Sequence, residues 1–551
     1  MAAATLRRSI AIRLKRLLSK TGNNPSLPRE QPCDIPSLPH EQPCEHNVAV
    51  CAIGIDLCVL GKVSRRATSQ TLPDDVLIEI FNFYRLSSVS LSRVRPWGWH
   101  ILVHVCQRWR SIIFDSPRYF DLRIFCTYAV PVRDILDHWP PLPIVIQYTG
   151  FSSLNPLATG DEDNIVVALQ QTDRVRTIEL TVTISLLEIL ATQPQGLFPA
   201  LEHLELLTHT EAGLTLSDAC FSGPAPNLRV LRTAKIGFPA LPRLLSSAGN
   251  LVSLQLEAVP STGYISPEDL IISLSTMTRL ATFNLHFLSP TSRPISREHQ
   301  PPQRRAVLPA LEYFSFRGVS EYLECLVSGI DTPFLKHIFI TFFNQATIFD
   351  IPKLSQFVCR TETQSSPDEA RVYYSGNDIS ITLTRGDRPH RMELQVRCLP
   401  LDWQLSCMAE ICEGLSLILS DVQQLDISPS SPLQIEQDDV DPLPLLELFQ
   451  PFRNVEMLRV AEEAASHVAY ALGQEHVGME VLPALRELYI EGDGEFTSGK
   501  QAFSSYITMR QNSNHPVIVR GWDPDNGRLT PTVRGVLPNN FRYAFRVSHI
   551  I

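Results

Sequence analysis

The chain has 551 residues, of which 44% are hydrophobic and 19% are charged, so it can bury a sizeable core and is long for a single domain. Its formal net charge of −10 gives no overall nucleic-acid-binding signature. The twelve cysteines include no paired CxxC motif and are compatible with a reducing compartment.

Residues 1–68 are predicted to form a flexible arm. The first 20 residues carry six basic side chains and no acid, and apolar residues are interleaved with them. A proline-rich near-duplication follows at 25–33 and 36–44, and its proline content opposes both helix and strand. A solvated tail is the preferred interpretation. A mitochondrial presequence, a nuclear import signal and contact with an anionic membrane remain alternatives.

The arm holds no predicted metal site or membrane span. Its cysteines and histidines lack the close, paired spacing of a zinc site, although they form a loose cluster of Cys33, His40, Cys44, His46, Cys51 and Cys58. The apolar stretch 48–60 is shorter than the roughly 20 residues that a spanning helix needs. No stable membrane insertion is therefore expected.

Residues 69–124 are predicted to form a module of two short amphipathic helices. Pro73 has the φ angle of a first helical position, and the acids after it suit the positive end of a helix. A second segment places apolar side chains on a common stripe, namely Trp97, Ile101, Val105, Trp109 and Ile112. Two short helices cannot bury this much apolar surface alone. The module therefore either caps the following domain or presents its stripe to a partner.

The phrase Leu72-Pro73-Asp74-Asp75-Val76-Leu77-Ile78-Glu79-Ile80-Phe81, followed after an insertion by Val105-Cys106-Gln107-Arg108-Trp109-Arg110, resembles an F-box. The resemblance implies that the module binds a Skp-family adaptor, and through it a cullin. It also implies an apolar adaptor contact made by Leu72, Pro73, Val76, Leu77 and Ile80, with Cys106 and Trp109 bracing or joining it.

Residues 125–551 are organised by a repeated cassette, apolar-x-x-apolar-x-apolar. Successive cassettes in its regular stretches start 23 to 31 residues apart, which is the long, irregular end of the leucine-rich-repeat period. The cassettes are Val175-Ile178-Leu180, Leu201-Leu204-Leu206, Leu228-Leu231, Leu251-Leu254-Leu256, Leu280-Phe283-Leu285, Leu311-Phe314-Phe316, Leu335-Ile338-Ile340, Val455-Leu458-Val460 and Leu485-Leu488-Ile490.

Each cassette predicts one short parallel strand, because its end alternates like a strand with one buried face. Connecting segments such as 240–247 and 267–275 have helical apolar spacing and should pack on the convex side. The fold class is therefore α/β: a helical module followed by an irregular solenoid with a concave, strand-lined face. The turns before three cassettes, each containing Pro-Ala-Leu, resemble those of leucine-rich F-box proteins of mushroom-forming fungi.

The repeat period weakens near 353–420. Residues 371–384 and 392–399 alternate like strands, with a turn at 376–378, so we expect a degenerate or hairpin-decorated part of the same solenoid. A separate small β domain is the alternative. An acidic loop is predicted at 429–444 and a proline-rich loop with basic residues at 289–305.

No catalytic constellation is found, and neither a cofactor nor an active site is predicted. His100 and His104 are four residues apart on the second predicted helix, but no acid or cysteine accompanies them as a further metal ligand. The expected function is that of a non-catalytic substrate receptor of an SCF-type ubiquitin ligase, cytoplasmic or nuclear, whose target the sequence does not identify. The alternative is a leucine-rich interaction or scaffold protein outside any ligase.

Overall fold

The computed structural model describes residues 72–91, 99–117, 119–125, 131–148, 159–192, 197–290, 305–343, 350–361, 366–386, 390–398, 401–429, 443–474, 481–491 and 501–522. The chain separates into two units, 1–71 and 72–551, and all described residues belong to the second. The predicted arm over 1–68 lies outside the described residues. So do most of the acidic loop and most of the proline-rich loop.

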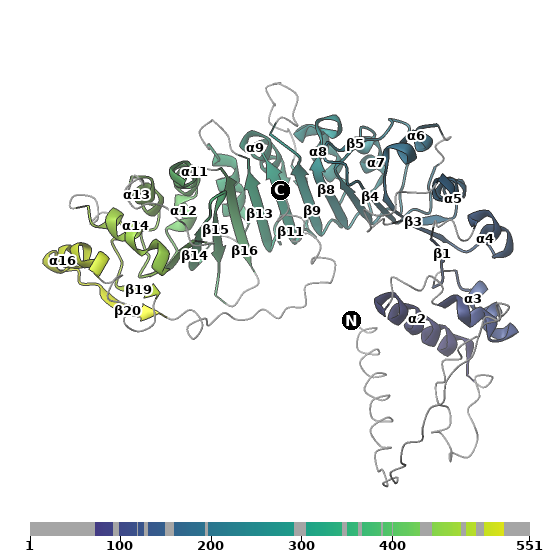
Figure 1. The fold of residues 1–551 in the computed structure, drawn as a ribbon, viewed down its shortest axis with the longest axis horizontal. Coiled ribbons are helices and arrows are strands. Elements are labelled where there is room, and N and C mark those ends of the chain that lie inside the picture. Colours follow the sequence, from purple (N-terminus) through teal and green to yellow (C-terminus); the bar gives the residue numbers. More distant parts are fainter. Residues whose placement is uncertain are drawn as a thin grey trace, which may run out of the picture. The chain divides into compact units, whose positions relative to one another are not determined.

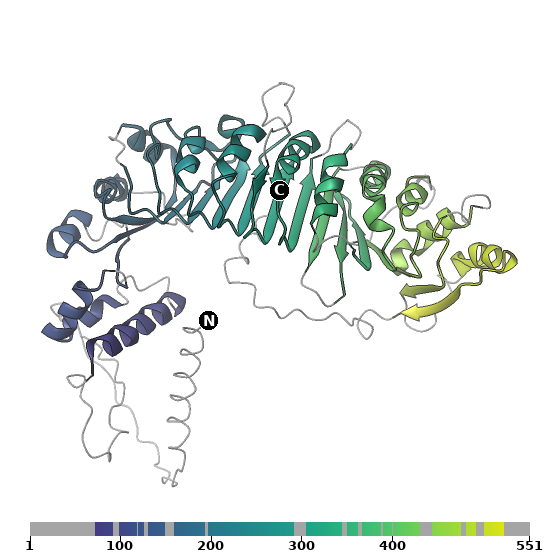
Figure 2. The same cartoon turned by 180° about the vertical axis from the view of Figure 1, so that it is seen from behind.

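Sixteen strands of the described chain form one long sheet (Figures 1 and 2). Neighbouring strands are parallel, except that β15 is antiparallel to both of its neighbours. In spatial order they are β1 (Leu122–Phe125), β2 (Ile144–Tyr148), β3 (Val175–Thr181), β4 (His203–Leu207), β6 (Val230–Ala234), β8 (Ser253–Val259), β9 (Thr282–Phe287), β11 (Tyr313–Gly318), β13 (His337–Phe342), β16 (Arg391–Arg397), β15 (Asp378–Thr384), β14 (Glu369–Tyr374), β17 (Gln424–Pro429), β18 (Met457–Val460), β19 (Glu487–Glu491) and β20 (Ile518–Trp522). Two short parallel pairs stand apart, β5 (Leu214–Thr215) with β7 (Ile236–Gly237) and β10 (Ala306–Val307) with β12 (Ile330–Asp331).

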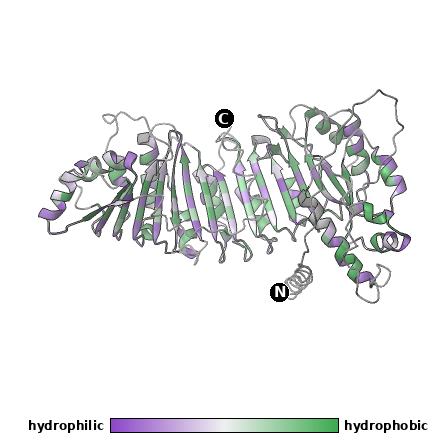
Figure 3. Cartoon of the chain, turned by 60° about the horizontal axis from the view of Figure 1, so that its bottom comes forward, coloured by the Kyte–Doolittle hydropathy of each residue, from purple (hydrophilic) through white to green (hydrophobic). Residues whose placement is uncertain are grey.

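Helices cover one face of this sheet and leave the other open (Figures 1 and 3). They are α4 (Val132–His138), α5 (Thr159–Leu169), α6 (Ile184–Thr192), α7 (Leu241–Ser247), η3 (Ser261–Gly263), α8 (Pro267–Leu274), α9 (Ser320–Ser328), α10 (Pro352–Arg360), α11 (Leu401–Gly414), α12 (Ser416–Leu419), α13 (Leu443–Phe449), α14 (Glu462–Leu472) and α16 (Ser504–Asn512). Successive helices pack on one another, for example α7 on α8, α8 on α9 and α9 on α10. The predicted helices at 240–247 and 267–275 are thus confirmed as α7 and α8.

Every predicted cassette coincides with a strand, which confirms the repeat. In β4, Leu204 and Leu206 are fully buried against the helices, while the alternating residues His203, Glu205 and Leu207 lie on the open face. The same alternation of buried and partly exposed residues recurs in β6, β8, β9 and β13. Each repeat therefore supplies one apolar layer that only its neighbours can cover.

Side-chain amides link the turns that precede successive strands. The Asn227 Nδ2 atom donates to the Pro199 carbonyl at 2.8 Å, and the Asn250 Nδ2 atom donates to the Pro226 carbonyl at 3.0 Å. Each bond spans one repeat, so it satisfies a turn carbonyl and holds neighbouring repeats in register.

The irregular region near 353–420 belongs to the same sheet. β14 and β15 form an antiparallel hairpin through the turn at 375–377, and β15 then pairs with β16. β16 lies beside β13, and β14 lies beside β17, both in parallel. The hairpin is therefore an insertion within the sheet and not a separate β domain.

The N-terminal part of this unit is helical: α2 (Asp74–Leu91), η2 (Trp99–His104) and α3 (Gln107–Phe114). The single apolar stripe predicted across the second segment is wrong, because η2 is a 3-10 helix and Cys106 is extended, with φ −161° and ψ 167°. Ile101 and Val105 consequently face solvent, whereas Ile112 is buried. None of the described helices is both long enough and apolar enough to cross a membrane.

An aromatic core joins these helices to the first strands. The Phe81 ring lies 4.7 Å from Trp109 and 6.4 Å from Phe120, which precedes β1. Trp139, at the end of α4, contacts Phe114 of α3 at 6.0 Å. The helical module and the solenoid therefore share one continuous core.

Candidate protein-interaction surfaces

The first candidate surface is the outer side of α2. Leu77 and Phe81 are buried, yet the flank beside them is also apolar, and it is exposed: Val76, Ile80 and Phe83 are 39%, 48% and 74% exposed. With the exposed Pro73 they recur at three- and four-residue spacing, so they form one continuous stripe. We call these four residues the α2 stripe. A helix whose apolar surface extends beyond its buried side has exposed apolar area available for a partner.

The orientation of α2 is held by α3. The Arg108 guanidinium donates to the Asp74 carboxylate at 2.5 and 3.1 Å and to the Leu72 carbonyl at 2.6 Å. This pair joins the start of α3 to the start of α2. Because the pair is partly exposed, its contribution to stability is small, roughly 0–1 kcal/mol, although two guanidinium nitrogens donate to the same carboxylate oxygen.

The predicted adaptor-binding residues lie in different environments. Pro73, Val76 and Ile80 belong to the α2 stripe, and Cys106 is exposed at the start of α3. Leu72 and Trp109 are partly buried against the core, and Leu77 is 1% exposed. Leu77 therefore cannot contact a partner directly, and it contributes only by packing α2 against the core. Sequence reasoning did not include Phe83, although it follows Ile80 at helical spacing.

The two histidines of the second helical segment do not share a face. His100 is buried and meets the Trp139 ring edge to face at 5.2 Å, whereas His104 is exposed. Nowhere in the described chain do three or more potential metal ligands gather.

The second candidate surface is the open face of the long sheet (Figure 3). It is built from the strand positions that alternate with the buried ones, so polar side chains stand in rows across neighbouring strands. These rows divide into three zones that differ in charge.

The zone over β4, β6 and β8 is an ion-pair ladder. Arg232 lies between Glu205 and Glu257, at 3.3 Å from each carboxylate, and His203 lies 3.6 Å from Glu205. Burial tends to raise the pKa of Glu205, but the hydrogen bond from His203 and the charge of Arg232 outweigh burial, so the pKa is lowered. The acids of this zone are therefore already engaged by cations of the same chain.

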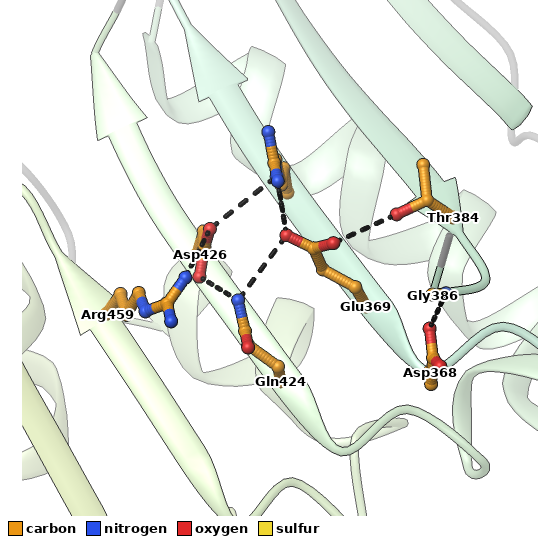
Figure 4. Close-up of polar contacts among 8 residues, drawn as sticks. Asp368, Glu369, Thr384, Gly386, Gln424, Asp426 and Arg459 are labelled. Carbon is orange, nitrogen blue, oxygen red and sulfur yellow. Dashed lines mark hydrogen bonds and ion pairs between the residues drawn. The ribbon is translucent and has the colours of Figure 1, made fainter. Parts of the chain in front are cut away.

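The zone over β14, β17 and β18 is a second closed network (Figure 4). Arg371 donates to Glu369 at 2.5 and 2.7 Å and lies 3.6 Å from Asp426, which is itself 3.8 Å from Arg459. The Gln424 amide bridges the two carboxylates at 3.3 Å each. Burial raises the pKa of Asp426 to about 6, against the opposing effect of the two arginines.

The zone between these two, over β9, β11, β13 and β16, is aromatic and cationic. The Tyr313 ring lies 5.2 Å from Phe339, and the Arg391 guanidinium stands 5.6 Å from the Phe339 centroid. Arg317 and Arg397 lie further along the same strands, on the same face. We call this region the central zone.

A shallow polar pocket of about 520 Å³ lies at the amino ends of β14, β17 and β18. Asp368, Asp421 and Glu456 line it, together with Arg385. The Asp368 carboxylate accepts a hydrogen bond from the Gly386 amide at 2.8 Å (Figure 4). The pocket lacks the apolar lining of a typical small-molecule site.

No protein-family model matches the sequence, and no curated protein matches it. Among solved structures, the chain is similar to the leucine-rich repeat-containing protein LegL7 from Legionella pneumophila, at 10% identity and a TM-score of 0.24. That match covers 70% of this chain and 97% of LegL7. A superposition this loose carries no argument, so the description of this chain as a leucine-rich solenoid rests on its own cassettes and strand register.

Proposed function

We propose that this protein is a substrate-recognition subunit of an SCF-type ubiquitin ligase. On this proposal the α2 stripe binds a Skp-family adaptor, and through it a cullin, while the open sheet face holds a target protein. The protein performs no chemistry itself; it raises the effective concentration of the target near the ubiquitin-loaded enzyme.

One observation carries the proposal. Three of the four residues of the α2 stripe, namely Pro73, Val76 and Ile80, fall within the phrase that resembles an F-box. A solvated helix face gains nothing from branched apolar side chains, whereas burying each one fully against a partner contributes about 1.5–3 kcal/mol. The match of motif and exposure therefore favours binding over simple capping.

The solenoid supports the second half of the proposal. Its open face extends across sixteen strands, and the solenoid helices that the structure describes lie on the other face (Figure 3). Extended faces of this kind are the binding surfaces of repeat proteins, because specificity can vary at exposed positions while the buried layer stays constant.

The test is co-purification of the full-length chain with the Skp-family adaptor of its host. The decisive variant is Val76→Glu with Ile80→Glu, since both side chains are exposed and the substitutions leave the core intact. Ile272→Glu is the matched control, because Ile272 is 67% exposed on α8, outside the helical module. We expect wild type and the control to bind and the double variant not to bind, with all three folded by circular dichroism. Folded wild type that does not bind, or a double variant that binds normally, would refute the proposal.

A second candidate function is a scaffold that works outside any ligase. It is favoured by the shared aromatic core, in which Phe81 contacts Phe120 and Trp139 contacts Phe114, as in a cap over the first strands. A scaffold would not bring cullin into the purified complex. Cullin recovery with wild type, and its loss with the double variant, separates the two functions.

A further inference from the structure

The central zone holds two arginines that no acid neutralises. In the described chain neither Arg317 nor Arg397 takes part in an ion pair, although arginines elsewhere on the same face are paired. Arg232, Arg371 and Arg520 each lie within 4.0 Å of a glutamate. The central zone therefore keeps a local excess of positive charge that the two neighbouring zones lack.

The strand register places both arginines near the carboxyl ends of their strands, β11 and β16. Arg317 in β11 stands opposite Thr341 in β13, and Thr341 stands opposite Gln395 in β16. Arg397 follows Gln395 by two residues on the same face, and Phe343 follows Thr341 by two residues. The Arg317 guanidinium lies 5.3 Å from the centroid of the Phe343 ring. An aromatic ring thus supports the cation from one side.

The acids nearest in register are engaged elsewhere. Asp378 is the cross-strand partner of Arg397, but its carboxylate accepts hydrogen bonds from Gln395 Nε2 at 2.8 Å and from Ser375 Oγ at 2.7 Å. Glu393 pairs with Arg391 at 2.6 Å. Neither carboxylate forms an ion pair with Arg317 or Arg397 in the described chain.

The surroundings make this excess of charge costly. Burial, together with the charge of Arg397, lowers the pKa of Arg317 to about 10, so Arg317 remains a cation at neutral pH. Burial and the same two arginines lower the pKa of His286 to about 4, so this neighbour is neutral and bonds Ser315 at 2.7 Å. The Nε atoms of both arginines are buried without a hydrogen bond. Two partly desolvated like charges are stabilised most directly by a bound oxyanion.

We propose that Arg317 and Arg397 form an oxyanion-binding site on the open sheet face, taking a phosphate or carboxylate group carried by a segment of the bound target protein. The identity of the ligand as part of a protein target rests on the proposed function, whereas the anion site itself does not. The adjacent rings of Tyr313 and Phe339 offer an apolar surface to the residues flanking that group.

The first test uses inorganic phosphate as the probe. We expect phosphate to raise the melting temperature of the full-length protein in a concentration-dependent manner, at constant ionic strength against chloride. Arg317→Gln with Arg397→Gln should abolish the shift. Arg520→Gln is the matched control, because Arg520 lies on the same face and pairs with Glu487 at 3.3 Å, and it should retain the shift. An equal shift in all three proteins, or none in folded wild type, would overturn the proposal.

The second test distinguishes the two sources of the oxyanion. Labelled peptide libraries with a central phosphoserine, glutamate or serine are titrated by fluorescence anisotropy. Binding of either anionic library should weaken about tenfold or more in the double Gln variant, while the serine library binds poorly to every protein. Preference for phosphoserine or for glutamate identifies the natural group. Arg317→Lys keeps the charge without the bidentate fork and should fall between wild type and the double variant.

These experiments are independent of the adaptor. If phosphate binding is lost in the double Gln variant but no adaptor co-purifies with wild type, the anion site stands and the ligase proposal fails. If the adaptor binds and phosphate does not, the ligase proposal stands and the anion site fails.

Discussion

Replacing Asp426 by Asn should stabilise the protein at neutral pH and leave its stability unchanged in acid. Burial raises the pKa of Asp426 from 3.8 to about 6, although Arg459 and Arg371 oppose this shift. A raised folded-state pKa means that the stabilisation by the bound proton is complete below pH 3.8 and is lost as the pH rises through about 6. At about 1.4 kcal/mol per pKa unit, ionisation costs the native state about 3 kcal/mol by pH 7.5. Asn keeps the shape and removes that cost.

The assay is urea unfolding of wild type and Asp426→Asn at several pH values between 4 and 7.5. The difference in unfolding free energy between the two proteins isolates this one carboxyl from all others. It should be near zero at pH 4 and grow to at most about 3 kcal/mol in favour of the variant at pH 7.5. Asp421→Asn, an exposed carboxyl nearby, should show no such trend. A variant that becomes less stable than wild type as the pH rises would show that the two arginines outweigh burial, and the reasoning would be refuted.

Three further substitutions test the packing. Phe81→Ala should lower the free energy of unfolding in urea by about 3–5 kcal/mol, because Phe81 is 1% exposed. Phe83→Ala on the same helix should leave it nearly unchanged, because Phe83 is 74% exposed. Equal losses would contradict the assignment of Phe81 to the buried side and Phe83 to the exposed side. Ser266→Ala removes the side-chain cap on the Asp269 amide and should cost about 1 kcal/mol, and an unchanged melting curve would show that the cap contributes nothing. Gly263→Ala should lower the melting temperature, because its Cβ would lie 2.7 Å from the Cα atom of Gly237 in β7. Gly249→Ala is the control, because its closest contact is at 3.6 Å, and equal melting of the two variants would refute the clash.

The buried half of the solenoid could be predicted from sequence because its signal is local. A cassette such as Leu251-Leu254-Leu256 specifies a strand by alternation alone, whatever lies beside it. The same spacing at Val422-Leu425-Ile427 was overlooked, although it gives β17. The break between η2 and α3 was not predicted, since the apolar spacing over that segment is equally compatible with one continuous helix.

The candidate sites were less accessible to sequence reasoning, for two different reasons. The α2 stripe required knowing which part of the apolar surface of α2 is buried, and that depends on Trp109 and Phe120, which pack against Phe81. The pair Arg317 and Arg397 required the strand order, because eighty residues separate the two arginines in the chain. Alternation shows that each arginine faces outward, but not that the two lie in the same zone of the sheet.

The hairpin insertion explains why the two arginines lie in the same zone. In a regular solenoid the strand after β13 would be the next along the chain, which here is β14. Instead β14 lies beside β17 and β15 lies between β14 and β16, so β16 becomes the parallel neighbour of β13. The insertion preserves the buried apolar layer, since Met392, Leu394 and Val396 continue it. It also changes the order of the exposed residues, and so brings Arg397 onto a strand that is separated from the strand of Arg317 by β13 alone. An irregularity that keeps the buried layer intact thus places both unpaired arginines within the central zone.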